Sequence, residues 1–206
     1  MQDLYVLGIT GPTGSGKTSL RPLLAERCCE FIDCDLLARR VVEPGEPALD
    51  DLVDAFGREI LNPDGTLNRP RLAAIAFASD ADNERLCSIV HPRVADLAMS
   101  LIDDAHSQGL HAAIDAPLLF QAGFDRLCTL SIAVLADKEL RTARIMERDG
   151  ITREAALQRI NAQPDDLYYF KRADRVLFNS GTELQFVRQA CLLLDPLLGK
   201  PRKRPH

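Results

Sequence analysis

The residues from Gly11 to Thr18 read GPTGSGKT and fit the pattern G-x-x-x-x-G-K-[ST]. They follow an apolar run, residues 4–9, with the length and composition of a buried strand, and precede residues 19–27, which are expected to be helical. This order of strand, glycine-rich loop and helix is the context in which the pattern binds phosphate. Glycines let the backbone aim its N–H groups at an anion, and the positive end of the helix adds to the attraction.

The polar groups of this loop have distinct expected roles. Lys17 is expected to reach the β- and γ-phosphates of ATP, and the Thr18 hydroxyl is a candidate ligand for Mg²⁺. The predicted nucleotide-binding residues of the loop are Gly11, Gly14, Ser15, Gly16, Lys17, Thr18 and Ser19. The alternative is a glycine-rich turn that happens to contain a lysine, and the strand and helix on either side argue against it.

Composition limits the classes of protein to consider. The net charge of −5 over 206 residues is unlike that of most nucleic-acid-binding proteins, so no nucleic-acid partner is expected. No apolar run approaches the length of a membrane span, and no positive region precedes an apolar segment at the N-terminus. We therefore expect a cytoplasmic protein without a membrane partner. A monomer is expected, with an oligomer left open.

Four further segments have the short, apolar character of buried parallel strands: residues 30–33, 111–114, 127–135 and 175–178. Helical patterns separate them, and strands that alternate with helices form a parallel sheet with both faces covered. The sequence therefore predicts an α/β fold of three layers, α/β/α, around a five-stranded parallel sheet.

The long gap between the second and third strands is predicted to be helical. Apolar residues recur at helical spacing over 48–56, 69–78, 83–90 and 93–105, and turn signals, including His91-Pro92, separate these segments. We interpret residues 36–110 as an inserted substrate-binding domain, with a structural cap over the sheet as the alternative. The nucleotide-binding core then comprises 1–35, 111–136 and 173–199. Residues 200–206 form a basic tail that is expected to be disordered.

A pair of predicted helices, within residues 137–172, is a candidate lid. Arg141, Arg144 and Arg148 are spaced so that one helical face presents three guanidinium groups. Phosphoryl transfer needs cations around the γ-phosphate, which favours a lid that closes with Arg144 and Arg148 over the nucleotide. The alternative is a solvated charged face, paired with Glu147 and Asp149.

Polar residues follow several of the predicted strands, at the edge where open parallel sheets bind ligands. Asp35 follows the second strand and is a candidate to orient the acceptor hydroxyl and take its proton, although it could also cap a helix that starts at Leu36. Asp115 is a candidate to hold a metal-bound water. Asn179, after the last strand, is a candidate to contact adenine.

A phosphate loop alone does not specify a reaction. The chain has no Asn-Lys-x-Asp stretch for reading guanine, and its one Asp-x-x-Gly, at 54–57, falls on a helical pattern. A motor or assembly ATPase usually has two adjacent acids after a strand, but Asp115 is followed by Ala116. A small-molecule kinase needs a phosphate loop, a carboxylate near the acceptor, a substrate domain and an arginine-bearing lid, and each has a candidate here.

The chain also resembles the dephospho-coenzyme A kinase family from residue 4 to about residue 194. The resemblance begins in the glycine-rich loop and continues through DCDLLAR at 33–39 and VVEPG at 41–45. The later matches, in the same order, are DGTLNR at 64–69, His91-Pro92, PLLF at 117–120, Arg148-Asp149, Gln163, Ala173-Asp174 and NSG at 179–181.

This resemblance implies phosphorylation of the ribose 3′-hydroxyl of dephospho-coenzyme A by ATP with Mg²⁺, the last step of coenzyme A synthesis. It implies that Asp35 is the base, and Arg39 and His91 are further candidates on the substrate side. The chain departs from the family at Gln121, where glutamate is usual, and at Pro12-Thr13, where Gly-Ile is common. Two alternatives stay open: a kinase of another small nucleotide or nucleoside, and a nucleotide-dependent binding protein that hydrolyses ATP slowly.

Overall fold

The computed structural model describes residues 4–201, so the predicted basic tail lies almost wholly outside the described residues. The chain divides into two compact units. The first contains residues up to Ile32 and from Ile102 onward, and includes the sheet and the expected lid segment; the second is Asp33–Leu101. The second unit thus begins and ends before the predicted boundaries of 36 and 110. No helix within residues 4–201 is both long and apolar enough to span a membrane.

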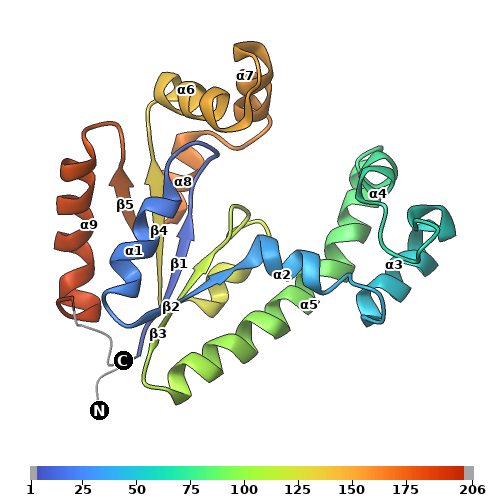
Figure 1. Cartoon of the computed structure of the whole chain (residues 1–206), viewed down its shortest axis with the longest axis horizontal. Coiled ribbons are helices and arrows are strands. Elements are labelled where there is room, and N and C mark those ends of the chain that lie inside the picture. Colours follow the sequence, from blue (N-terminus) through green and yellow to red (C-terminus); the bar gives the residue numbers. More distant parts are fainter. Residues whose placement is uncertain (1–3, 202–206) are drawn as a thin grey trace. The chain divides into compact units, whose positions relative to one another are not determined.

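Five strands form the sheet of the first unit (Figure 1). They are β1 (Val6–Thr10), β2 (Cys29–Asp33), β3 (His111–Asp115), β4 (Leu130–Leu135) and β5 (Arg175–Phe178). Their spatial order is β2-β3-β1-β4-β5, and β1 pairs in parallel with both β3 and β4. Every residue of β1 is buried, as expected of the central strand of a sheet covered on both faces. The predicted fold class is confirmed.

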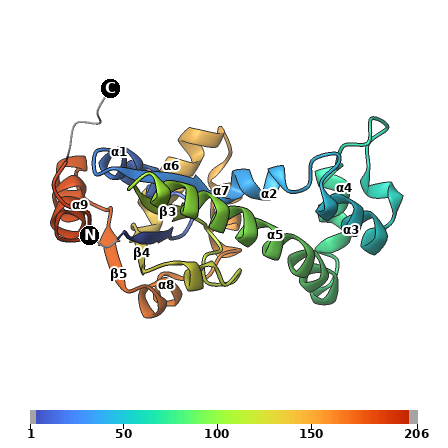
Figure 2. The ribbon, with the colours of Figure 1, turned by 90° about the horizontal axis from the view of Figure 1, so that it is seen from below.

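Side chains of β4 alternate between two cores, which explains why this strand is apolar at every position except Ser131. Ile132 and Val134 join a core formed with α1 (Leu20–Ala25) and α9 (Glu183–Leu198). Leu135 packs instead with Tyr169 of α8 (Asp166–Arg172). Figure 2 shows α1 and α8 on opposite sides of the strands. The sheet therefore buries apolar side chains on both faces, the main favourable contribution to folding.

The helix after the glycine-rich loop is shorter than the predicted 19–27. A 3₁₀ turn over Lys17–Ser19 precedes α1, which spans Leu20–Ala25. Pro22 accounts for the irregular start, because it has no N–H to donate to the carbonyl of Thr18 and its ring crowds that carbonyl. Regular α-helical bonding consequently begins only after the loop.

The second unit is helical. It contains α2 (Cys34–Arg40), α3 (Pro47–Phe56), a 3₁₀ turn at Arg58–Ile60, α4 (Arg69–Ala76) and most of α5 (Asp80–Ser107). The Asp64-Gly65 turn reverses the chain between Leu61 and Leu67, which form an isolated antiparallel bridge. The Asn68 side chain then accepts a hydrogen bond from Arg71 N–H and caps α4.

The predicted break at His91-Pro92 is wrong, because α5 continues through Pro92 as one helix. Proline inside a helix removes one hydrogen bond and costs about 3 kcal/mol. The apolar stripe nevertheless continues after the proline with Val94, Ala98 and Ile102, all buried. Tertiary burial along this stripe offsets the local cost of the proline.

Residues 137–172 contain the expected pair of helices, α6 (Lys138–Asp149) and α7 (Arg153–Asn161), followed by α8. Gly150 ends α6 in the left-handed conformation that favours glycine, with φ of 64°. The Thr152 hydroxyl accepts a hydrogen bond from Ala155 N–H and caps α7. These two features separate the two helices of the predicted pair.

Asp174 connects the beginnings of β4 and β5. Its carboxylate accepts hydrogen bonds from the Ser131 hydroxyl at 2.6 Å and from Ser131 N–H at 2.8 Å. These bonds lower the pKa of Asp174 below its ordinary value of 3.8, and the bond from the Ser131 hydroxyl contributes most. The ionised carboxylate is thus the form that holds the two strands together.

Replacing Asp174 by alanine is expected to lower the free energy of unfolding by about 1 kcal/mol at neutral pH, the typical value of a hydrogen bond on an exposed group. A group whose pKa is lower in the folded than in the unfolded state stabilises the fold at pH values above its unfolded-state pKa. This stabilisation is lost as the pH falls through the folded-state pKa. The difference between wild type and variant should therefore shrink below pH 3.8, which urea unfolding at several pH values would measure. A difference that does not change with pH would contradict this role.

Candidate nucleotide-binding site

The glycine-rich loop leaves the carboxyl end of β1 in a conformation that requires its glycines. Gly11 has a φ of 135°, and a Cβ there would lie 2.2 Å from the carbonyl oxygen of Val134 in β4. Gly14 and Gly16 have φ values of 77° and 87°. Within the loop, Ser15 N–H donates to the carbonyl of Pro12 at 3.2 Å. The loop is therefore a tight turn against β4, where side chains at Gly11 would not fit.

Lys17 folds back over this loop. Its Nζ donates to the carbonyl of Gly11 at 2.9 Å, which places the ammonium group at the start of the loop. Thr18 and Ser19 follow in the exposed 3₁₀ turn, and Ser19 N–H donates to the carbonyl of Gly16. The loop thus gathers an ammonium group and a hydroxyl at the positive end of a helix, where an anion is favoured.

Asp115 ends β3 and lies beside Ile9 of β1 in the sheet register, one residue before β1 ends. Its carboxylate is therefore on the same sheet edge as the loop. Within residues 4–201, no group of three or more His, Cys, Asp or Glu side chains could hold a metal ion by itself. A hydroxyl and one carboxylate fit Mg²⁺, which is usually held by one or two protein oxygens together with substrate phosphates and water. The buried Ser15 hydroxyl has no hydrogen-bond partner among residues 4–201, which fits a loop that receives a further polar group.

Arg144 of α6 binds the outer side of the loop through backbone carbonyl groups. Its Nη1 donates to the carbonyls of Gly14 and Ser15, both at 3.3 Å, and its Nη2 donates to the carbonyl of Asn179 at 3.2 Å. The buried Asn179 side chain donates in turn to the Ser15 carbonyl at 2.8 Å. The structure therefore places both predicted residues at the loop, in contact with its backbone.

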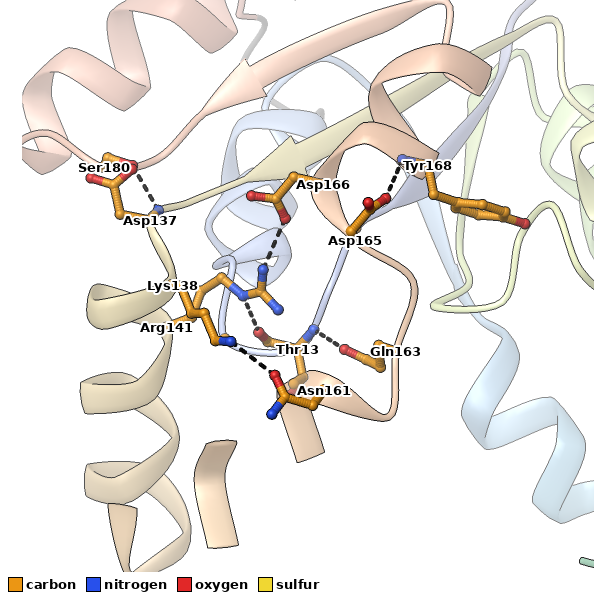
Figure 3. Close-up of polar contacts among 12 residues, drawn as sticks. Thr13, Asp137, Lys138, Arg141, Asn161, Gln163, Asp165, Asp166, Tyr168 and Ser180 are labelled. Carbon is orange, nitrogen blue, oxygen red and sulfur yellow. Dashed lines mark hydrogen bonds and ion pairs between the residues drawn. The ribbon is translucent and has the colours of Figure 1, made fainter. Parts of the chain in front are cut away.

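Arg141 was expected on the same helical face as Arg144, and the structure gives it a different environment. Its side chain is buried, its Nε donates to the carbonyl of Thr13 at 3.1 Å, and its Nη1 pairs with Asp166 at 2.9 Å (Figure 3). Burial lowers the pKa of its guanidinium while Asp166 opposes the shift. The alternative of a solvated charged face is therefore wrong at Arg141.

Arg148 lies at the far end of α6 and is largely exposed. It makes two hydrogen bonds to Asp149, at 2.7 and 2.9 Å, and Arg159 of α7 pairs with the same carboxylate. These contacts lower the pKa of Asp149, and the hydrogen bonds from Arg148 contribute most. The structure therefore contains the pairing of Arg148 with Asp149 that was the alternative to a lid contact. A contact of Arg148 with nucleotide stays a prediction.

The remaining predicted residues belong to the second unit. Asp35 does not cap a helix at Leu36, so that alternative is wrong: α2 begins at Cys34, and the Asp33 carboxylate accepts from the N–H groups of Asp35 and Leu36. Arg39 is exposed on the last turn of α2. His91 lies within α5, where burial lowers the pKa of its imidazole and favours the neutral form.

One residue at the site, Gln163, had no role assigned from the sequence. Gln163 accepts a hydrogen bond from Thr13 N–H at 2.7 Å, so it contacts the loop directly. The Ser180 hydroxyl accepts from Asp137 N–H at 2.9 Å and joins the start of the lid segment to the segment after β5 (Figure 3). In the sequence, Gln163 stood out only as one of the residues that resemble the dephospho-coenzyme A kinase family.

All six cysteines are free thiols, and burial raises the pKa of Cys128 to about 12, which keeps that thiol protonated.

A phosphate loop on the central strand of a parallel β2-β3-β1-β4-β5 sheet, contacted by arginines from a helical hairpin, defines a P-loop kinase fold. The family model described as dephospho-CoA kinase matches residues 5–185. A dephospho-CoA kinase from Corynebacterium glutamicum is 40% identical over 195 residues, which cover 94% of this chain and 98% of that protein. The chain belongs to the dephospho-CoA kinase family.

Solved structures share this fold. A Thermus thermophilus protein has a TM-score of 0.75 at 32% identity, covering 94% of this chain and 98% of its own. The dephospho-CoA kinase of Campylobacter jejuni has a TM-score of 0.68 with the same coverage of both chains. At 23% identity, this match supports a likeness in fold alone.

The contacts of the two arginines predict different outcomes for their removal. Arg144→Ala removes charged hydrogen bonds to the loop, and such bonds contribute about 1.5–3 kcal/mol, so kcat/KM for ATP should fall about 10- to 100-fold. Arg141→Ala also removes a contact to the loop and should weaken nucleotide binding, but because Arg141 is buried and paired with Asp166 it should in addition lower the melting temperature, which Arg144→Ala should hardly change. Steady-state kinetics with a thermal melt would distinguish them. Equal and small effects at both positions would contradict this assignment.

Proposed function

We propose that this protein catalyses transfer of the γ-phosphoryl group of ATP to the ribose 3′-hydroxyl of dephospho-coenzyme A, giving coenzyme A and ADP. The observation that carries the proposal is the family match over residues 5–185, which includes the phosphate loop with its lysine and threonine. The helical second unit supports it further, because a nucleotide switch has no need of a domain for a second substrate. We propose that the protein works in the cytoplasm, with these small molecules as its partners, and as a monomer.

The residues of the first unit would hold ATP. The N–H groups of the loop and the Lys17 ammonium would bind its phosphates, and Thr18 and Asp115 would hold Mg²⁺, which supplies positive charge to the phosphate oxygens. Arg144 would keep the loop in shape from its carbonyl side and add positive charge near the nucleotide. Asn179 and Ser180 belong to the segment proposed to lie near adenine, and Arg148 would approach the phosphates only if α6 moved.

Asp35 would orient the acceptor hydroxyl and accept its proton. It follows the carboxyl end of β2, and open parallel sheets bind their ligands beyond these ends. A loose transition state demands little of a base, so orientation of the hydroxyl would be a large part of the role.

The second unit would bind the rest of the acceptor. It contains a cavity of about 420 Å³ lined by two cations, Arg40 and Arg93, of which Arg93 also pairs with Asp51 at 3.0 Å. The other lining residues are Val41, Glu46, Pro47, Ala48, Asp96, Leu97 and Ser100. Arg39 and His91 remain candidates for acceptor binding in this unit.

An acceptor panel tests the proposal. The purified protein would be incubated with ATP, Mg²⁺ and one acceptor at a time, while ADP release is followed and the product is identified by mass spectrometry. Dephospho-coenzyme A should be phosphorylated, and adenosine, AMP and buffer alone should not. Efficient transfer to another nucleoside or nucleotide would make the protein a different small-molecule kinase. Slow ADP release that no acceptor stimulates would identify a nucleotide-dependent binding protein.

A further inference from the structure

Thr13, in the middle of the phosphate loop, is held from both sides by the lid segment. Its N–H donates to Gln163 Oε1 at 2.7 Å, and its carbonyl accepts from Arg141 Nε at 3.1 Å (Figure 3). Both partners are more than a hundred residues away in sequence. One residue of the loop thus has both of its backbone polar groups bound by side chains of a single distant segment.

The segment that carries Gln163 is fixed at both of its ends. The N–H groups of Ala162 and Gln163 donate back to α7, to the carbonyls of Gln158 and Ile160. On the other side, the Asp165 carboxylate caps α8 by accepting from Tyr168 N–H at 2.8 Å. Gln163 is therefore presented to the loop from a short connection between two helices.

Arg141 is fixed as well. It is almost completely buried, and its ion pair with Asp166 joins it to the first residue of α8. The two groups that hold Thr13 consequently belong to one connected structure, formed by α6, the 162–165 connection and α8. The loop conformation is coupled to the position of this structure as a whole.

The geometry of the peptide bond explains what these contacts do. In a planar trans peptide, the C=O and N–H of one unit point in opposite directions. Because Arg141 binds the Thr13 carbonyl, it also fixes the direction of Gly14 N–H, which belongs to the same peptide plane. Asn179 and Arg144 bind the Ser15 carbonyl and fix Gly16 N–H in the same way. Gln163 fixes the Pro12–Thr13 peptide plane through Thr13 N–H. The Pro12–Thr13 and Thr13–Gly14 planes therefore cannot rotate independently.

We propose that Gln163 is a positioning residue of the nucleotide site: by holding Thr13 N–H, and together with Arg141, it orients the loop so that Gly14 N–H faces a bound phosphate. The inference rests on the proposed use of ATP but is independent of the acceptor. It assigns to the 162–165 connection a function in nucleotide affinity, in addition to any movement of the lid.

Gln163→Leu tests the inference because leucine is similar in size and cannot accept a hydrogen bond. Loss of one such bond, with a donor left unsatisfied, should weaken ADP binding about tenfold by calorimetry. KM for ATP should rise in parallel while KM for dephospho-coenzyme A stays constant. In the nucleotide-free protein, amide exchange at Thr13 should become faster by NMR. Gln163→Asn, whose shorter side chain cannot reach Thr13, should weaken ADP binding similarly and provides a second variant if the leucine variant does not fold.

Asn161→Leu is the matched control. Asn161 is also an amide, at the end of α7, and its Oδ1 accepts a hydrogen bond from the side chain of Lys138 in α6 at 2.8 Å (Figure 3). This variant should retain ADP affinity and slow exchange at Thr13. Unchanged ADP affinity in both Gln163 variants, or an equal loss in Asn161→Leu, would overturn the inference. Because ADP binding and amide exchange do not involve the acceptor, failure of the acceptor panel would leave this test unaffected.

Discussion

Lys17→Ala is expected to lower kcat for phosphoryl transfer at least about 10²- to 10³-fold, the cost of removing one group that stabilises developing charge in a transition state. The ammonium group already lies over the loop, 2.9 Å from the Gly11 carbonyl, so little reorganisation separates it from a bound phosphate. Alanine removes this charge without changing the glycines that shape the loop. The loss should therefore appear in kcat and in ATP affinity together.

Steady-state kinetics at saturating dephospho-coenzyme A would measure this effect, with a thermal melt to check folding. Lys171→Ala provides a matched control, because Lys171 is an exposed lysine in the last turn of α8. The control should keep the wild-type rate. A folded Lys17→Ala protein with near wild-type turnover would exclude Lys17 from the transfer step.

Asp35→Asn should lower kcat about 10²- to 10⁴-fold, the typical contribution of a general base, while ATP affinity hardly changes. Asparagine keeps the shape of the side chain and loses the proton acceptor. The structure sharpens this experiment, because the cap of α2 is Asp33, whose carboxylate accepts from the N–H groups of Asp35 and Leu36. A change at Asp35 therefore leaves the helix cap in place, and a loss of activity cannot be ascribed to a lost cap.

Asp33 provides the control for this prediction. Asp33→Asn should retain both activity and stability, because asparagine caps helices nearly as well as aspartate. Asp33→Ala should lower the free energy of unfolding by about 1 kcal/mol through loss of the cap. Unchanged kcat in Asp35→Asn at saturating ATP would remove Asp35 from the reaction, whatever the outcome at Asp33.

The sheet was predictable because its strands are short apolar runs bounded by polar residues. The β5 segment, Arg175–Phe178, agrees with its prediction at both ends. Predicted β4 began at residue 127, three residues earlier than observed, because residues 124–127 are also apolar in part and form a 3₁₀ turn. Continuity of α5 was not predictable from local signals, since Pro92 is a strong helix-breaking signal and only burial of the following stripe overrides it.

The phosphate loop was predictable because its function depends on local residue types at fixed spacing. The contacts behind the loop were not, because they join residues that no pattern relates. Sequence spacing placed Arg141 and Arg144 on one face of a helix, and only the structure distinguishes the buried Arg141 from Arg144 at the Ser15 carbonyl. Asn179 was predicted near adenine, which stays a prediction, and the structure shows in addition its hydrogen bond to the loop backbone.

The long sequence separation within the loop contacts has a consequence for how the protein is made. Ser15 is held by Asn179, 164 residues later, and Thr13 by Gln163, 150 residues later. During synthesis from the N-terminus, the motif is complete after Thr18, but the side chains that fix its backbone are added only once synthesis reaches Gln163 and Asn179. Contacts of such long range form slowly, because a large loop of chain must first be closed. A nascent chain that still lacks β5 should therefore carry an intact nucleotide-binding motif and bind no nucleotide.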